Sequence, residues 1–223
     1  MRIKYLLLII ILLFPTLLFA KDRCRDFIPD IRAASIRYLG LSYPWWYNVG
    51  CAMAESNCRA DIVSFDGGKG LYQFTESTGV VAEIKKDMPI NPSNAESSIK
   101  AEAFYMNKII NTYLKRPEFK FKGKEKYRID PSYFTKKCGT RLSDAYRHYN
   151  GGAWFIYESK LDGYTCDKDS MREHCVRGGA WVPNEKAKNR RWLSFCDVNY
   201  SYPDKIFKFS KPYKVGKDGM NYW

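Results

Sequence analysis

The sequence contains few of the residues that build metal sites, since only two of its 223 residues are histidines. His174 is followed directly by Cys175, and Cys166 lies nine residues before Cys175. Zinc-binding motifs use closely spaced pairs of Cys and His, and this arrangement fits none of the common spacings. The other histidine, His148, has no nucleophile paired with it in the sequence. The scarcity of histidine therefore argues against a zinc site.

Long apolar runs are also scarce: one extends from Leu6 to Ala20, and no second run of that length follows. Arg2 and Lys4 precede the run, and Ala20 offers a small residue at a cleavage position. A run of about 15 residues is short for a membrane span, and the layout is typical of a secretory signal peptide. We therefore expect residues 1–20 to direct export to the periplasm or cell envelope. They act either as a cleaved signal or as a retained anchor.

Acidic residues are outnumbered, with 24 Asp and Glu against 37 Lys and Arg. Without Arg2 and Lys4, the formal net charge falls from +13 to +11. Such a charge favours anionic partners, among them cell-wall polymers, anionic lipids and nucleic acid. The charge by itself does not choose among these partners.

Seven cysteines in a chain expected to be exported indicate an oxidising compartment and disulfide bonds. Because the number is odd, one cysteine is expected to stay free, and Cys51 is the best candidate since it stands in the middle of an expected core helix. The other six are compatible with three disulfides, whose connectivity the sequence leaves open. They are Cys24, Cys58, Cys138, Cys166, Cys175 and Cys196.

Helical periodicity dominates the chain as far as residue 158, which predicts a mainly α fold. The clearest helix extends from Ala95 to Leu114, where apolar residues recur every three or four positions and Ser93 or Asn94 can serve as N-cap. Residues 117–137 alternate between basic and apolar residues around Gly123, which predicts a small basic β-hairpin. Further helices are expected at about 27–39, 44–56, 75–86 and 142–159.

Residues 159–223 have a different composition, with three cysteines, three tryptophans and many tyrosines. Their helical periodicity is poor except near 184–193, and the alternation of Phe207 and Phe209 with lysines resembles a short strand. The expected organisation is therefore a signal peptide at 1–20, a helical domain at 24–158 and a disulfide-tied basic extension at 159–223.

One set of residues stands out by its spacing. Glu55 and Ser56 end an apolar helical stretch, Ser64 follows nine residues after the glutamate, and Gly70-Leu71-Tyr72-Gln73 ends eighteen residues after it. The motif Ala145-x-x-x-Tyr149-Asn150-x-Gly152 comes later in the chain. At these offsets, residues 40–158 resemble the lytic transglycosylases of the soluble (SLT) type, within the lysozyme-like superfamily.

The physical requirement of such an enzyme is an acid that is protonated near neutral pH. An exposed glutamate, with a pKa of about 4.3, does not meet it. Burial against apolar groups raises the pKa by disfavouring the charged form. The apolar helix before Glu55 offers a setting for such burial.

The resemblance implies a lysozyme-like fold and a lyase acting on the peptidoglycan of the cell wall. The enzyme would cleave the β-1,4 bond between N-acetylmuramic acid and N-acetylglucosamine, and the 6-hydroxyl of the muramic acid would attack its own anomeric carbon. The product would be a 1,6-anhydro sugar formed without water, with Glu55 as acid and then as base. The resemblance implies no metal or organic cofactor, and glycan strands rather than nucleic acid as partner.

The resemblance also implies roles for four other residues. Ser64 and Gln73 would line the cleft beside the scissile sugar, Tyr149 would orient Glu55, and Asn150 would bind substrate. Tyr72 departs from the family pattern, which has methionine near the substrate's acetyl group. Two milder departures are Gly151, where the family has alanine, and Cys58, which could tie its loop by a disulfide.

Two other functions stay open at this point. Asp66, eleven residues after Glu55, stands where goose-type lysozymes carry a water-activating carboxylate. A separation of roughly 6.5–9.5 Å between the two carboxyl groups would suit an inverting muramidase. The alternative to an enzyme is a catalytically silent wall-binding scaffold. For the transglycosylase, residues 159–223 could dock the enzyme onto an envelope-spanning conjugation or secretion complex, or a phage system, which it would serve by opening the wall locally.

Overall fold

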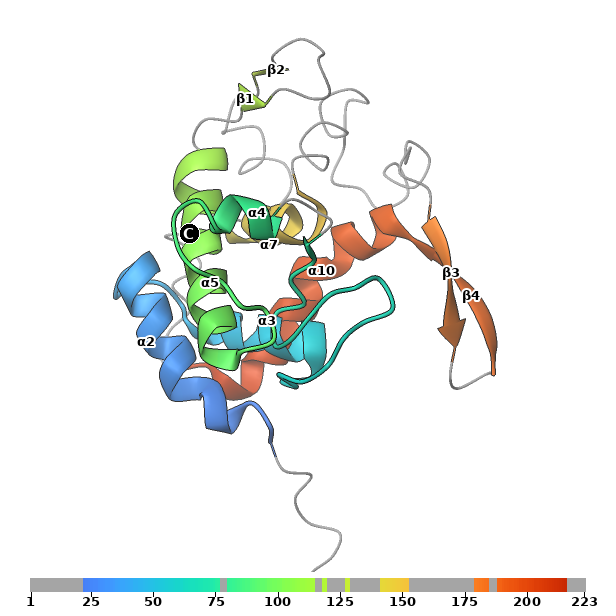
Figure 1. The fold of residues 1–223 in the computed structure, drawn as a ribbon, viewed down its shortest axis with the longest axis horizontal. Coiled ribbons are helices and arrows are strands. Elements are labelled where there is room, and N and C mark those ends of the chain that lie inside the picture. The colour runs from blue at the N-terminus through green and yellow to red at the C-terminus, as the bar shows by residue number, and fades with distance from the viewer. Residues whose placement is uncertain are drawn as a thin grey trace, which may run out of the picture.

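The computed structural model describes residues 22–76, 80–114, 118–119, 127–128, 141–152, 179–184 and 188–215. Over these residues the chain is mainly helical, as the sequence predicts (Figure 1). The signal peptide expected at 1–20 lies outside the described residues. Residues 120–126, between the two strands of the expected hairpin, also lie outside them. None of the helices in the described ranges has the length and apolar character needed to cross a membrane.

The principal helices are α2 (Ile28–Leu39), α3 (Trp46–Ser56), α4 (Val80–Ile84), α5 (Ala95–Lys108), α7 (Arg141–Gly151) and α10 (Phe195–Ser210). Single turns are η2 (Arg25–Phe27), the π-helical turn η4 (Ile109–Tyr113) and η5 (Lys211–Tyr213). The predicted cap of the 95–114 helix is confirmed, since the Asn94 side chain accepts from the backbone N–H of Ser97 at 2.9 Å.

The strands form two antiparallel pairs. In the first, β1 (Glu118–Phe119) pairs with β2 (Tyr127–Arg128), inside the segment predicted to be a basic hairpin. In the second, β3 (Gly179–Asn184) pairs with β4 (Asn189–Ser194), and this hairpin projects from the helical body (Figure 1).

The helix expected near 184–193 is wrong, because residues 189–194 form β4. This stretch has no apolar stripe that a helix could bury. In the hairpin, by contrast, Trp181 stands opposite Trp192, and such cross-strand aromatic pairs stabilise antiparallel strands.

The strand expected around Phe207 and Phe209 is also wrong, because both residues lie in α10. Five of the six buried positions of α10 recur at the helical spacing of three and four, and Pro203 is the sixth. The five are Cys196, Asn199, Tyr202, Ile206 and Ser210. Ser194 caps the helix by accepting from the backbone N–H of Asp197 at 3.2 Å. Polar residues at two of these five stripe positions, Asn199 and Ser210, interrupt the apolar periodicity of the sequence.

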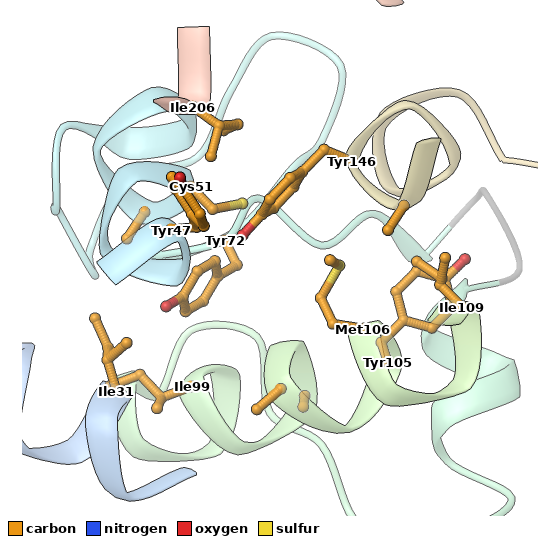
Figure 2. Packing of buried hydrophobic residues seen from close by; sticks show 14 of the residues in the cluster. Ile31, Tyr47, Cys51, Tyr72, Ile99, Tyr105, Met106, Ile109, Tyr146 and Ile206 are labelled. Atoms are coloured by element: carbon orange, nitrogen blue, oxygen red, sulfur yellow. The ribbon is translucent and has the colours of Figure 1, made fainter. Parts of the chain in front are cut away.

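The core lies where α3 packs against α10 and where α2 packs against α5 (Figure 2). Gly50 marks the closest approach of α3 to α10, since a Cβ there would stand 2.5 Å from the backbone oxygen of Ile206. The Tyr47 ring packs against Phe207 with 4.9 Å between centroids. The C-terminal helix is therefore part of the same core as α3.

One disulfide, Cys24–Cys58, joins the segment before η2 to the loop that follows α3. Its presence confirms the predicted disulfide bonding and the expectation that Cys58 ties its loop. Cys196 is also disulfide-bonded. Cys51 is free and buried, as predicted.

The close helix crossing at Gly50 predicts that alanine at this position lowers the stability of the fold, the opposite of its usual effect. Exchanging a helical glycine for alanine normally stabilises by about 0.5–1 kcal/mol. Here Gly50→Ala would push α10 away from α3, and we expect a loss of about 1–3 kcal/mol, typical of overpacking. Thermal unfolding followed by circular dichroism measures the change. An equal or higher midpoint for the variant would contradict the close crossing.

Candidate active site

Glu55 lies in the last turn of α3, where the helix ends abruptly. Asn57 and Cys58 both take left-handed backbone conformations, with φ of 55° and 53°, so the chain reverses directly after the glutamate. Ser56 fixes this reversal, because its buried hydroxyl lies 2.8 Å from the Leu71 carbonyl oxygen and accepts from the Arg59 N–H at 3.1 Å. The Glu-Ser pair thus joins the end of α3 to the 70–74 turn.

Tyr202 of α10 is the direct partner of Glu55, and its hydroxyl donates to Glu55 Oε1. The sulfur of Cys51 lies 3.4 Å from the same hydroxyl oxygen. Since the tyrosine proton is directed to the carboxylate, the thiol is left to donate to the tyrosine oxygen. Tyr202 is 3% exposed, so the donor is held in the core next to a half-buried acid.

Tyr202 was not among the site residues predicted from the sequence, because residues 159–223 were expected to form a separate extension. The available signal was the spacing of Cys196, Asn199, Tyr202 and Ile206 on one helical face. The offset from Glu55 carries no such signal, because a partner that approaches from a distant helix is set by tertiary packing.

The pKa of Glu55 is raised, chiefly because burial disfavours its charged form. The hydrogen bond from Tyr202 and the positive charge of Lys205 lower the pKa, while the nearby negative charge of Asp66 raises it. Lys205 is held in place by donating to the Ala54 carbonyl at 2.7 Å. The site therefore favours a protonated Glu55 at a higher pH than an exposed glutamate allows.

The loop after α3 brings Ser64 and Gln73 together around Gly68. A Cβ at Gly68 would stand 2.7 Å from Ser64 Oγ and 2.9 Å from Gln73 Oε1, so a larger residue there would displace both side chains. Gln73 has a φ of 52° and donates to the Gly70 carbonyl at 2.7 Å. Ser64 donates to Asp66. The Gln73 amide thus holds the turn, whether or not it also contacts a substrate.

Gly70 is fixed by a similar constraint. A Cβ there would stand 1.9 Å from the Pro92 carbonyl oxygen, and its φ is +70°, a conformation that suits glycine. The Gly-Leu-Tyr-Gln turn therefore packs directly on the segment before α5. Of its members, Leu71 and Tyr72 are buried and Gln73 is half-buried.

Tyr72 points into the core rather than toward the loop. Its hydroxyl donates to the Asn48 carbonyl at 3.1 Å, and its ring lies among the buried residues of α3 and α5 (Figure 2). The departure from methionine at this position is thus accommodated by a core hydrogen bond.

Tyr149 of α7 lies beside Tyr202, with the two rings stacked at 12° and 6.5 Å between centroids. Its hydroxyl donates to the Tyr72 carbonyl at 3.0 Å, whereas the bond to Glu55 comes from Tyr202. Tyr149 therefore contacts the hydrogen-bond partner of Glu55 and does not itself donate to the carboxylate.

Asn150 and Asp66 are both exposed. The Asn150 side chain accepts from Asn199 of α10 at 3.3 Å, and Asn199 also donates to the Arg147 carbonyl at 2.7 Å. The chain thus brings Glu55, Tyr202 and Tyr149 together in one contact network, with Ser64, Asp66 and Gln73 on the loop that follows α3. Among the described residues, no group of three or more His, Cys, Asp and Glu is placed to hold a metal.

No protein-family model matches the chain, and no curated protein matches it.

The charges around Glu55 predict opposite shifts from three substitutions. Tyr202→Phe removes a donor to the carboxylate and Lys205→Met removes a positive charge, so both should raise the Glu55 pKa. Asp66→Asn removes a negative charge and should lower it. Carbon-13 NMR titration of labelled glutamate carboxyl groups measures each value, with the Glu55 signal assigned by its loss in Glu55→Gln. Shifts of the same sign in all three variants would contradict the arrangement.

Proposed function

We propose that the chain is an exported peptidoglycan lytic transglycosylase with a lysozyme-like helical domain. The observation that carries the proposal is Glu55, a half-buried carboxyl with a raised pKa that accepts from Tyr202 beside the Ser64–Gln73 loop. The spacing of Glu55, Ser64, Gln73 and Tyr149 supports the same family.

In this mechanism Glu55 protonates the glycosidic oxygen that leaves from the muramic acid residue. The resulting carboxylate then takes the proton of that residue's 6-hydroxyl as it attacks the anomeric carbon, which closes the 1,6-anhydro ring. Tyr202 donates a hydrogen bond that strengthens when Glu55 becomes charged. It therefore stabilises the Glu55 carboxylate that exists between the two proton transfers. Lys205 acts in the same direction through its charge. One carboxyl group thereby serves both proton transfers.

The loop offers both polar and apolar side chains to a sugar strand, which has polar edges and apolar ring faces. Ser64 is half-buried, while Phe65 and Val63 beside it are 76% and 61% exposed. We propose that Ser64, Gln73 and Asn150 contact the sugar strand and that Tyr149 acts through Tyr202. The protein would work in the periplasm or at the cell envelope, locally opening the wall for an envelope-spanning assembly.

Digestion of purified peptidoglycan tests the enzyme. We expect soluble fragments with 1,6-anhydro-muramic ends from the wild-type protein and a rate lower by about 10²–10⁴-fold for Glu55→Gln, since positioned acid catalysis contributes that much. Mass spectrometry of the fragments identifies the ends. Glu55→Gln protein that is folded yet equally active would remove Glu55 as the acid. A wild-type protein that binds but releases no fragments would favour the wall-binding scaffold.

Asp66 supports a second candidate, a muramidase that adds water, because its charge acts on Glu55. In the transglycosylase, Asp66→Asn should keep most of the rate and the same anhydro products. Because the substitution lowers the Glu55 pKa, the pH at which activity falls with deprotonation of Glu55 should shift slightly downward. In the muramidase it should abolish cleavage, and the wild-type products should carry reducing ends. The product analysis and the Asp66→Asn rate therefore give two independent answers.

A further inference from the structure

The β3–β4 hairpin carries an exposed aromatic pair that the proposed active site does not use. Trp181 and Trp192 are 58% and 52% exposed, and they stand directly opposite each other in the register. Their rings meet edge to face with 5.7 Å between centroids. Two large exposed indoles on one strand pair are unusual for a surface that contacts only water.

The pair is held in place by the hairpin itself. A Cβ at Gly179 would stand 2.8 Å from the Trp192 ring, so the indole lies against the backbone of the neighbouring strand, where only glycine leaves room. The tryptophans are thus a preformed platform, whose ordering cost is met in folding rather than in binding.

The two faces of the hairpin differ sharply. Val182, next to Trp181, is 6% exposed, which turns its face of the hairpin toward the molecule and the tryptophan face toward solvent. Arg190 lies two residues before Trp192 and so shares its face, whereas Arg191 pairs with Val182 on the other. Both arginines are exposed. The solvent face therefore combines two indoles with a positive charge.

We propose that Trp181, Trp192 and Arg190 form a binding surface for the glycan strand of peptidoglycan, outside the Glu55 site. This proposal rests on the function proposed above. Indole rings are large, rigid and amphipathic, and they stack on the apolar faces of pyranose rings. The Arg190 guanidinium complements the carboxylates of the stem peptides, or the free lactyl carboxylate of muramic acid residues that carry no peptide. The partner is therefore an acidic polysaccharide.

The position of the tryptophans argues against a lipid surface. They lie in the middle of the strands, while the end of the hairpin is closed by Asn184 and Asn189, with the exposed Lys188 beside them. A hairpin that enters a membrane would need apolar residues at this end. A lateral face of this kind suits an extended polymer that lies along the strands.

The test measures binding of the full-length exported protein to purified peptidoglycan sacculi, in a Glu55→Gln background that prevents cleavage. We expect Trp181→Ala with Trp192→Ala to lower the affinity about tenfold or more, as for tryptophans at the centre of an interface. Tyrosine at both positions should restore part of the loss. Leu41→Ala, which truncates a residue 87% exposed on another segment, should leave binding unchanged.

Arg190→Glu and Arg191→Glu provide a matched pair that leaves both tryptophans in place. The two substitutions change the net charge equally at adjacent positions, yet only Arg190→Glu should weaken binding to sacculi. Added salt should reduce the difference in affinity between the two variants, because it screens the charges. Circular dichroism and the thermal midpoint confirm that each variant is folded. Equal binding of these two charge variants, or of the alanine variants and the parent, would overturn the proposal.

A control with vesicles of phosphatidylethanolamine and phosphatidylglycerol addresses the lipid alternative. Loss of vesicle binding in the alanine variants, without loss of sacculus binding, would overturn the glycan proposal. Failure of the enzyme proposal gives a different result: wild-type protein would release no fragments, while tryptophan-dependent sacculus binding would still support the hairpin surface.

Discussion

The crossing of α10 over α3 is the contact on which the candidate site depends. At Gly50 the two helices approach so closely that no side chain fits between them, and Ile206 and Ser210 lie directly against the glycine. On α10, Tyr202 lies four residues before Ile206, and on α3, Glu55 lies five residues after Gly50. The Tyr202 hydroxyl donates to the Glu55 carboxyl group across this crossing. A displacement of α10 by even an ångström would break this hydrogen bond, because its donor and acceptor belong to the two helices that cross. Packing between backbones therefore sets the position of the acid's partner.

The balance at Glu55 is a compromise between two requirements. Burial raises the pKa and keeps the proton available for donation, but it would strand a carboxylate once that proton has left. Tyr202 and Lys205 both favour the charged form, which limits the cost of that state. The burial also destabilises the fold above the ordinary pKa of glutamate, since the folded state then holds a proton that the unfolded state releases. A site of this kind gains reactivity from a local loss of stability.

How far the sequence predicts the structure depends on whether a feature is local. Asn94 as N-cap and the helix that follows it are written in adjacent residues, and so is the free Cys51 on a buried helical face. The placement of Ser64 and Gln73 around Gly68 follows from a short loop with glycine at a fixed point. Tyr202 depends on a helix more than a hundred residues away, whose buried stripe includes Asn199 and Ser210, so apolar periodicity did not reveal it. The β3–β4 hairpin was not predicted for a related reason. Its strands are stabilised by contacts with each other, and neither strand shows a clear alternation of apolar and polar residues.

The continuity between β4 and α10 gives the C-terminal segment a physical role beyond that of an appendage. Ser194 is both the last residue of β4 and the cap of α10, so the hairpin continues directly into the helix that carries Tyr202. Force on the tryptophan face would be carried through this junction to Tyr202, eight residues further along the chain. Removing residues 159–223 would delete the partner of the acid together with the hairpin, and so would not separate catalysis from docking. Substitutions on the solvent face of the hairpin leave the helix crossing intact, which makes them the means of separating the two.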